Sequence, residues 1–515
     1  MYVQCKPNKS GSISVYVMGE ENGTVRLIKN FGVAYTKEEL QVLQAEADRY
    51  TKDPSGAQLE LFKTDRDQEV TDFFSVLKNS QLQVIGPELI YGALYNRIGY
   101  NQIDNDMFRH LVITRLFKPG SKLKTIEYLG RYLGVHYRID RIYRCLDNVC
   151  YREGRKSKKP DIKTQVDQIT FEYTRKVLGG QISVVFYDMT TLYFEASDED
   201  DMRIPGFSKD GKNTHPQIFL GLLVAAGGNP IGYEVFKGNI YEGHTLIPVL
   251  EKLSAKFGLG RPIVIADSGL LNKNNVVALQ ENGYEYILGA KLKNEGEAIQ
   301  KAILSRNLNY GEVAIFERDA VTRLVVSRTE NRAKKDAYNR KRKIKKMQKK
   351  IGNGKVTKDV LKFPASGKGV VLEGNATMRI DWEALEAESA WDGIKGYITN
   401  SSLPAKEVIA NYGQLWFIER SFRMNKTDLR IRPMYHRLKN RIEGHICICF
   451  AAYTIMLELE RLLKKANSSL TLDSCRTLVD TMYQISYVLP ESQTREKRFL
   501  GMDEQQEELY AIINS

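Results

Sequence analysis

The segment Ile182-Ser-Val-Val-Phe-Tyr187, followed directly by Asp188, is the stretch of sequence that decides the fold. Its β-branched and aromatic residues predict a short strand that is buried on both faces. Two more strands are predicted at residues 217–225 and 231–236, on either side of a Gly-Gly-Asn-Pro turn. The segment is therefore predicted to be the first strand of a sheet.

Downstream of these strands, helical and strand patterns alternate. A helix is predicted at residues 245–256, a buried strand at 262–266 that ends at Asp267, a helix at 275–281 and a strand at 284–290. Strands that alternate with helices in this way predict a mixed α/β sheet with helices on its faces.

Upstream of the sheet the pattern is helical. Residues 105–117 and 122–133 read as amphipathic helices, and Pro119-Gly120-Ser121 turns the chain between them. Two short helices joined by a tight turn fit a DNA-binding helix-turn-helix, but they fit an ordinary helical domain equally well. Nearer the N-terminus, residues 12–30 predict a β-hairpin around Asn22-Gly23, and Thr36 with Glu39 predicts a capped helix that runs to about residue 50.

Residues 294–395 interrupt the α/β pattern. Strands are predicted at 313–316 and 323–326, and residues 332–350 then hold eleven Lys or Arg against one acid, Asp336. Such a run is often a solvated face or a flexible arm, and it is also the pattern of a segment that tracks phosphates. Helices are predicted to return at 404–425, at 437–465 and near 472–485.

The charge of the chain indicates a polyanionic partner. Its 515 residues carry 76 Lys or Arg against 63 Asp or Glu, a formal net charge of +13. Nucleic acid is the commonest partner of so basic a protein. The 6 cysteines form no Cys-x-x-Cys pair, and neither a signal peptide nor a membrane span is evident, so we expect a cytoplasmic protein with reduced thiols.

Three acids are candidates for chemistry because of their positions. Asp188 and Asp267 each follow a predicted central strand, and Glu419 lies in the helix that returns after the interruption. Strand ends on one side of an α/β sheet converge on a common edge, and converging carboxylates need cations to neutralise them. Carboxylate oxygens suit Mg²⁺ or Mn²⁺, and two such ions about 4 Å apart can promote phosphodiester cleavage. A single acid at a strand end can also be a simple turn former.

The Glu419 helix carries a mixed polar stripe. Tyr412, Leu415, Arg423 and Lys426 lie at −7, −4, +4 and +7 from Glu419, which places them on one face of a continuous helix. This face could hold metal at its centre and phosphates beside it. It could equally be a solvated face with an ordinary Glu–Arg pair.

Three ordered segments resemble the cut-and-paste DDE transposases of bacterial insertion sequences, in the insertion-sequence-four superfamily. They are Tyr187-Asp-Met-Thr-Thr-Leu-Tyr-Phe-Glu195 with Gly206-Phe-Ser-Lys-Asp-Gly211 downstream, Val264-Ile-Ala-Asp-Ser-Gly-Leu270, and Tyr412-x2-Leu415-x3-Glu419-x6-Lys426. The third is similar to the family's Tyr-x2-Arg-x3-Glu-x6-Lys signature. A segment at Gly238-Asn239 with Glu242 and Thr245 also resembles the family, and the resemblance covers about residues 85–465.

The resemblance implies an α/β fold with a ribonuclease-H-like catalytic core, a β-rich insertion and an N-terminal helical domain. It implies that Asp188, Asp267 and Glu419 are catalytic and bind two Mg²⁺ ions, with Mn²⁺ as a possible substitute. It also implies that Tyr412 and Lys426 approach the DNA, that the substrates are terminal inverted repeats and target DNA, and that a homodimer pairs two ends.

One residue departs from the family signature. Leu415 stands where the family usually has Arg, and Arg423 on the same face is a candidate replacement. Leu415 keeps open an inactive transposase that only binds DNA, and a general nuclease on the same fold is a further alternative. In the basic run we expect phosphate contacts from Lys341, Arg342, Lys343, Lys345 and Lys346.

These patterns divide the chain into six segments. We expect a small N-terminal module (1–85), a helical DNA-binding domain (86–175), the first part of the catalytic core (176–293), a β-rich and basic insertion (294–395), the second part of the core (396–465) and a C-terminal helical region (466–515).

Overall fold

A computed structural model describes most of the chain. The described residues are 1–21, 24–52, 65–150, 160–195, 198–206, 214–241, 244–270, 273–352, 370–373, 377–380, 382–432, 434–489 and 491–515. Within this part, the chain forms two compact units, residues 1–81 and 82–515. No helix of the described residues is long and apolar enough to cross a bilayer.

The first unit is built on a three-stranded antiparallel sheet. Its strands are β1 (Tyr2–Pro7), β2 (Ile13–Glu21) and β3 (Thr24–Ala34), and helix α1 (Lys37–Lys52) packs on them. The predicted hairpin and the Thr36–Glu39 capping box are confirmed, although the turn at residues 22–23 lies outside the described residues. Strand β1 was not predicted, and helix α2 (Asp65–Ser75) completes the unit.

The second unit contains an eight-stranded mixed sheet. Its first five strands in chain order are β5 (Val184–Tyr193), β6 (Gln217–Ala225), β7 (Pro230–Lys237), β8 (Ile263–Ala266) and β9 (Tyr286–Gly289). They lie in the order β7-β6-β5-β8-β9, with antiparallel pairing from β5 to β7 and parallel pairing from β5 to β9. Three antiparallel strands followed by two parallel strands form a ribonuclease-H-like sheet, as predicted.

The insertion adds its strands to this same sheet. β14 (Ile394–Thr399) pairs with β9, followed by β11 (Arg323–Arg328) and β10 (Val313–Glu317), all antiparallel. β10 and β11 match the strands expected at 313–316 and 323–326, whereas the β-rich and basic insertion at 294–395 stays a prediction. Its other elements are α10 (Glu297–Ser305), α11 (Glu330–Gly352), the hairpin of β12 (Val370–Glu373) and β13 (Thr377–Ile380), and α13 (Trp382–Ser389).

Each face of the sheet has its own core. Alternate residues of β5 point to opposite faces, so Phe186 and Leu192 belong to one core while Val185 and Tyr187 belong to the other. Helices α8 (Leu246–Phe257) and α9 (Lys273–Glu281) cover the second face. The first face carries α14 (Ala405–Gly413), α15 (Trp416–Thr427) and α16 (Lys439–Lys465).

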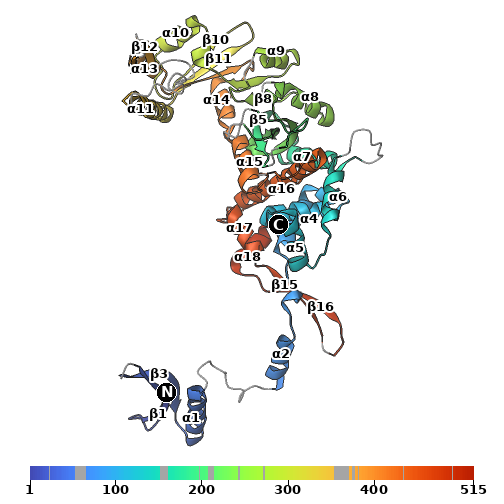
Figure 1. The fold of residues 1–515 in the computed structure, drawn as a ribbon, viewed down its shortest axis with the longest axis vertical. Helices are drawn as coiled ribbons and strands as arrows, with labels where there is room; N and C mark the ends of the chain where they lie inside the picture. The colour runs from blue at the N-terminus through green and yellow to red at the C-terminus, as the bar shows by residue number, and fades with distance from the viewer. Residues whose placement is uncertain are drawn as a thin grey trace. The chain divides into compact units, whose positions relative to one another are not determined.

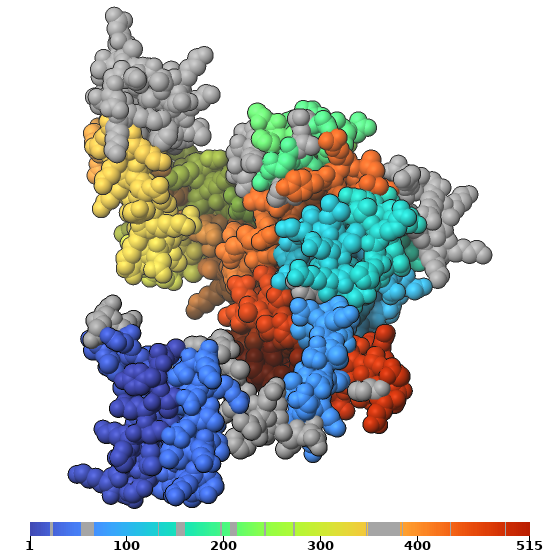
Figure 2. Space-filling view, turned by 60° about the horizontal axis from the view of Figure 1, so that its bottom comes forward, coloured from blue at the N-terminus to red at the C-terminus, as the bar shows by residue number. Residues whose placement is uncertain are grey.

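Helix α16 connects the sheet to a helical layer. The layer comprises α3 (Ala93–Ile98), α4 (Asp106–Phe117), α5 (Lys122–Leu133), α6 (Ile139–Val149) and α7 (Ile162–Val177). α16 contacts α3, α4, α6 and α7, and α7 also packs directly against β7 of the sheet (Figure 1). In the space-filling view the orange residues of the C-terminal half lie directly against the cyan helices (Figure 2).

Two helix predictions need correction in this layer. α4 was expected to be amphipathic, but nine of its twelve residues are buried, because other elements pack around it on several sides. The helix expected near 472–485 ends early: α17 (Leu472–Val479) is followed by β15 (Tyr483–Val488), which pairs with β4 (Leu82–Val84). β16 (Arg495–Phe499) and α18 (Glu504–Asn514) complete the chain.

Candidate active site

Strand pairing places two of the three candidate acids side by side. β5 pairs in parallel with β8, and Tyr187 is the register partner of Ala266, so Asp188 and Asp267 are the next residues of neighbouring strands. Asp267 is exposed directly after β8, as predicted, and Asp188 is half-buried. The two carboxylates therefore come from adjacent positions at one edge of the parallel part of the sheet.

Asp188 does not end its strand, contrary to the prediction. β5 continues to Tyr193 because β6 pairs with it over its whole length, with Asp188 opposite Leu222. Only the parallel pairing with β8 stops at Tyr187. Asp188 is thus held rigidly in a strand, and its Oδ1 accepts a hydrogen bond from the backbone N–H of Met189 at 2.7 Å.

Glu419 does not lie on one continuous helix with Tyr412. The helix predicted at 404–425 breaks into α14 and α15, which meet at Gln414 and Leu415. Tyr412 and Glu419 therefore belong to different helices, although Gln414 and Leu415 between them keep right-handed helical dihedral angles. Glu419 occupies the first turn of α15 and is exposed, and α15 packs against β5.

Tyr412 is bound to Asp267. Its hydroxyl donates a hydrogen bond to Oδ1 of Asp267 at 3.2 Å, and the ring is 5% exposed. Burial and the Asp267 carboxylate raise the pKa of Tyr412 far above its ordinary value, so the hydroxyl stays protonated and donates. The ring can approach only because Gly289 of β9 has no side chain: a Cβ there would lie 2.5 Å from the Tyr412 hydroxyl oxygen.

Lys395 of β14 is a site residue that the sequence did not reveal. Its Nζ lies 4.4 Å from the centre of the Tyr412 ring. The carboxylates of Asp267 and Glu419 both favour the protonated form of its amine. Burial and the nearby Arg332 lower the pKa of Lys395, and the two acids oppose that change. One lysine at the start of a strand has no distinguishing sequence pattern. Asp267 and Glu419 thus both favour the charged form of Lys395.

The three acids supply the oxygen ligands that a hard divalent cation prefers. Asp188 and Asp267 are neighbours in register, and Glu419 acts on the same lysine as Asp267. Even so, among the described residues no three His, Cys, Asp or Glu side chains are grouped closely enough to hold a metal ion. The donor chemistry fits a metal, whereas Tyr412 and Lys395 are the groups found against the acids.

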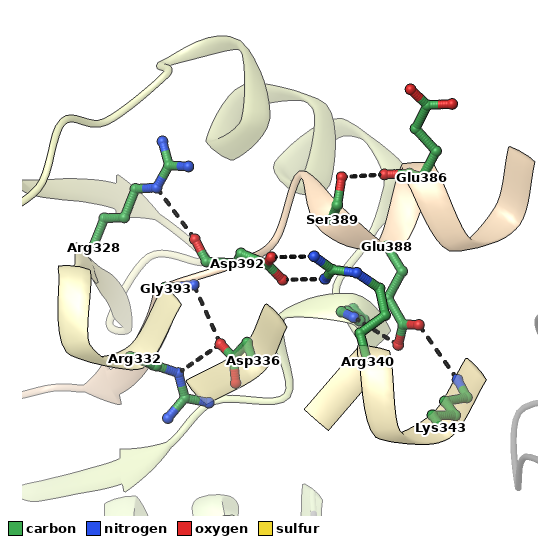
Figure 3. Close-up of polar contacts among 11 residues, drawn as sticks. Arg328, Arg332, Asp336, Arg340, Lys343, Glu386, Glu388, Ser389, Asp392 and Gly393 are labelled. Carbon is green, nitrogen blue, oxygen red and sulfur yellow. Dashed lines mark hydrogen bonds and ion pairs between the residues drawn. The ribbon is translucent and has the colours of Figure 1, made fainter. Parts of the chain in front are cut away.

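A cavity of about 730 Å³ opens beside Asp267 and Tyr412. Lys291, Lys293 and Lys395 line it together with residues of α11 and α13, so it is rich in cations and also contains acids. Figure 3 shows how its wall is fixed: Arg340 of α11 makes a bidentate ion pair with Asp392, and Lys343 pairs with Glu388.

The residues predicted to bind DNA differ in their availability. Lys343 is partly buried in its ion pair with Glu388, whereas the other four predicted residues of the basic run are exposed: Lys341, Arg342, Lys345 and Lys346. Arg423 is exposed and Lys426 is half-buried. Arg420 of α15 pairs with Glu460 at 2.8 Å, and no ion pair of the described residues joins Glu419 to Arg423.

Leu415 is buried, and part of the motif pattern falls outside the described residues. Leu415 is 8% exposed and belongs to the core beneath α15. Residues 207–213 of the segment that begins at Gly206, and Glu242, lie outside the described residues. Thr245 accepts a hydrogen bond from the Tyr187 hydroxyl at 2.9 Å, which ties the start of α8 to the strand that carries Asp188.

The sheet order is that of a ribonuclease-H-like core, and Asp188 and Asp267 follow the paired ends of its neighbouring parallel strands. The family comparison agrees with this class. Residues 179–455 match the transposase DDE domain, and the chain belongs to that family. No match was found among curated proteins.

Several solved structures are distantly similar. The piggyBac transposase synaptic complex with hairpin DNA is 12% identical, with 76% of each chain covered and a TM-score of 0.38. The Drosophila P element transposase strand transfer complex is 9% identical, with 80% of this chain and 90% of that chain covered and a TM-score of 0.21. The Mos1 transposase paired-end complex with the left transposon end is 12% identical, with 47% and 71% covered and a TM-score of 0.16.

Proposed function

We propose that this protein is a transposase that cuts DNA at the ends of its element and joins them to target DNA, in the manner of the insertion-sequence-four superfamily. The observation that carries the proposal is the register of β5 and β8, which sets Asp188 beside Asp267 at one sheet edge. The transposase DDE domain match over residues 179–455 supports it.

Each residue of the site has a proposed role. Asp188, Asp267 and Glu419 are the catalytic acids and would hold two Mg²⁺ or Mn²⁺ ions. When bound, such ions supply activation of the attacking oxygen and stabilisation of the leaving oxygen. Tyr412 orients the Asp267 carboxylate through its hydroxyl. The Lys395 ammonium partly neutralises the negative charges of Asp267 and Glu419.

The proposed substrate is double-stranded DNA, both at terminal inverted repeats and at the target. The net charge of +13 supports a polyanionic partner, and the exposed cations of α11 lie on the element that forms one wall of the cavity beside Asp267. Lys341, Arg342, Lys345 and Lys346 would contact phosphates, together with Arg423 and Lys426. Because two ends must be joined, we propose that the protein acts as a homodimer. We also propose that it acts in the cytoplasm of a bacterium.

Charge-removing variants of the acids test the chemistry. Asp188→Asn, Asp267→Asn and Glu419→Gln should each lower Mg²⁺-dependent cleavage of end-containing DNA by at least about 10³-fold, because an amide is a poor ligand for a hard cation. DNA binding should change by less than about 3-fold, since phosphate contacts come from other residues.

Glu407→Gln, an exposed acid on neighbouring α14, is the matched control and should cleave normally. Full cleavage by any one of the three variants would reject the role given to that residue. If the wild-type chain binds element ends but never cleaves them with Mg²⁺ or Mn²⁺, the alternative of a non-catalytic DNA-binding protein replaces the proposal. Cleavage without preference for ends would instead indicate a general nuclease.

A further inference from the structure

A second cavity lies at the turn between α4 and α5, and none of the three acids lines it. It has a volume of about 340 Å³, and α4, α5, α6, α16 and the segment after α15 contribute to it. Of the described residues that line it, none is acidic, and half can carry a positive charge. We name it the basic pocket, and its cationic or titratable residues are Arg115, Lys122, Arg430, Arg432, His436 and His445.

Two of these cations are buried without a carboxylate. Lys122, the first residue of α5, is 8% exposed, and its Nζ lies 3.5 Å from Nδ1 of His445. Arg115 is 6% exposed and donates a long hydrogen bond, 3.4 Å, to the carbonyl oxygen of Leu429. Among the described residues neither makes an ion pair with an acid, although buried cations are normally paired.

The neighbouring positive charges in the pocket lower one another's pKa values. Burial, and then Arg115, lower the pKa of Lys122 to about 7. Burial, Lys122 and Arg115 together hold the pKa of His445 well below its ordinary value, and His436 is lowered to about 3 by burial and the same two cations. An anion in the pocket would remove this mutual repulsion. The N-terminus of α5, capped by Ser121, adds the positive end of a helix dipole.

The pocket continues into a neighbouring cavity of about 410 Å³. The two share Pro119, Gly120 and Arg430, and the second adds Lys118, Lys124 and Arg131, with Glu127 as its one acid among the described residues. Exposed cations therefore extend away from the buried ones, and Lys118 among them pairs with Asp480 at 2.7 Å. A row of this kind suits a chain of phosphates better than a single free phosphate ion.

We propose that the basic pocket binds a backbone phosphate of DNA, with Lys122 and Arg115 as its buried anchors and Arg430 at its mouth. The choice of DNA as the source of the phosphate rests on the proposed function. The phosphate chemistry rests on the pocket alone. The site lies at the turn predicted between residues 117 and 122, so it would give the α4–α5 pair a role in phosphate contact rather than in reading bases.

Lys122→Met in the full chain tests the proposal, with Lys465→Met, an exposed lysine in the last turn of α16, as the control for lost charge. Thermal unfolding is measured in inorganic phosphate and in chloride at equal ionic strength. Binding to a random-sequence duplex is measured against salt in EDTA. We expect phosphate to raise the Tm of the wild type and of Lys465→Met by about 1–3 °C. Lys122→Met should lose that rise.

We also expect Lys122→Met to reduce the salt slope of duplex binding by about 0.9, which shrinks the affinity ratio between about 50 mM and about 200 mM salt by about 3-fold. If Lys122→Met fails to fold, Arg430→Met, at an exposed position, carries the same two measurements. A variant that keeps both the phosphate effect and the slope overturns the pocket.

The remaining outcomes separate the sources of the phosphate. Loss of the phosphate effect with an unchanged salt slope overturns the DNA assignment and leaves a site for free phosphate. Neither readout needs metal or cleavage. A chain that shows both expected effects but never cleaves DNA would therefore refute the proposed function and retain the phosphate pocket.

Discussion

Gly289 is the residue whose missing side chain gives the candidate site its shape. Replacement with Ala would place a Cβ 2.5 Å from the Tyr412 hydroxyl oxygen and 3.1 Å from the backbone nitrogen of Ser268. Because the strand is rigid, Tyr412 must move and its hydrogen bond to Asp267 must break. We expect Gly289→Ala to cost about 1–3 kcal/mol of stability and to reduce cleavage by about 10-fold or more.

Thermal unfolding and the cleavage assay measure these two effects. Gly296→Ala is the matched control because a Cβ there meets no atom within 4 Å. A Gly289→Ala protein with wild-type cleavage would show that Tyr412 does not need to contact Asp267.

The burial of Leu415 changes the meaning of its departure from the family signature. An Arg at this position, 8% exposed in the core, would have to bury its charge unless the α14–α15 junction opened. The resemblance implies that Leu415 removes a cation that positions DNA, because the family usually has Arg there. Its burial in the core indicates a packing role at the start of α15 instead.

At the scale of elements, ion pairs hold α11 to the turn that precedes β14. Arg340 and Asp392 form a bidentate pair whose side chains are 19% and 16% exposed (Figure 3). Arg340→Met leaves the Asp392 carboxylate half-buried without its partner. We expect a loss of about 2 kcal/mol in urea unfolding.

Lys334→Met is the control for this variant, because it removes an exposed i,i+4 pair with Glu330 on the same helix and should leave the urea midpoint close to that of the wild type. Equal effects from the two variants would show that Arg340 does not anchor α11.

Hydrophobic periodicity located most elements of the second unit, because their apolar residues face the core in a regular pattern. Predicted strands at 217–225 and 262–266 match β6 and β8 closely, and 122–133 matches α5. The strand predicted at 182–187 is shorter than β5 because the apolar run ends at Asp188, whereas pairing with β6 continues the strand to Tyr193. Such extension depends on a neighbouring strand, which a local pattern cannot show.

The candidate site was only partly predictable for a related reason. Asp267 follows its strand as expected, since apolar residues lead up to a polar one. Lys395 reaches the acids only through the pairing of β14 with β9, across more than a hundred residues of chain. The basic pocket was hidden in the same way, because its cations come from α4, α5, α16 and the segment after α15.

At the scale of the whole molecule, the two ends of the second unit fold against each other. β4 pairs with β15, and the backbone N–H of Ile85 donates to the carbonyl oxygen of Met482 at 2.9 Å. Arg97 of α3 donates to the carbonyl oxygen of Ile513 in α18 at 2.7 Å. The segment after α16 is thus part of the core rather than a tail.

A final prediction follows for two shortened proteins. Removing residues 467–515 takes away the buried apolar side chains of Cys475, Val479, Leu509 and Ile513, about 6–10 kcal/mol of burial, which is comparable with the whole stability of a domain. We expect that protein to show no cooperative unfolding transition by calorimetry. Removing residues 1–81 takes away a unit with its own core at Val15, Val17 and Ala47, so residues 82–515 should keep the wild-type transition of the second unit within about 2 °C. Cooperative unfolding of the protein that lacks 467–515 would mean that the core folds without the C-terminal elements. Residues 82–515 would then not form one folding unit.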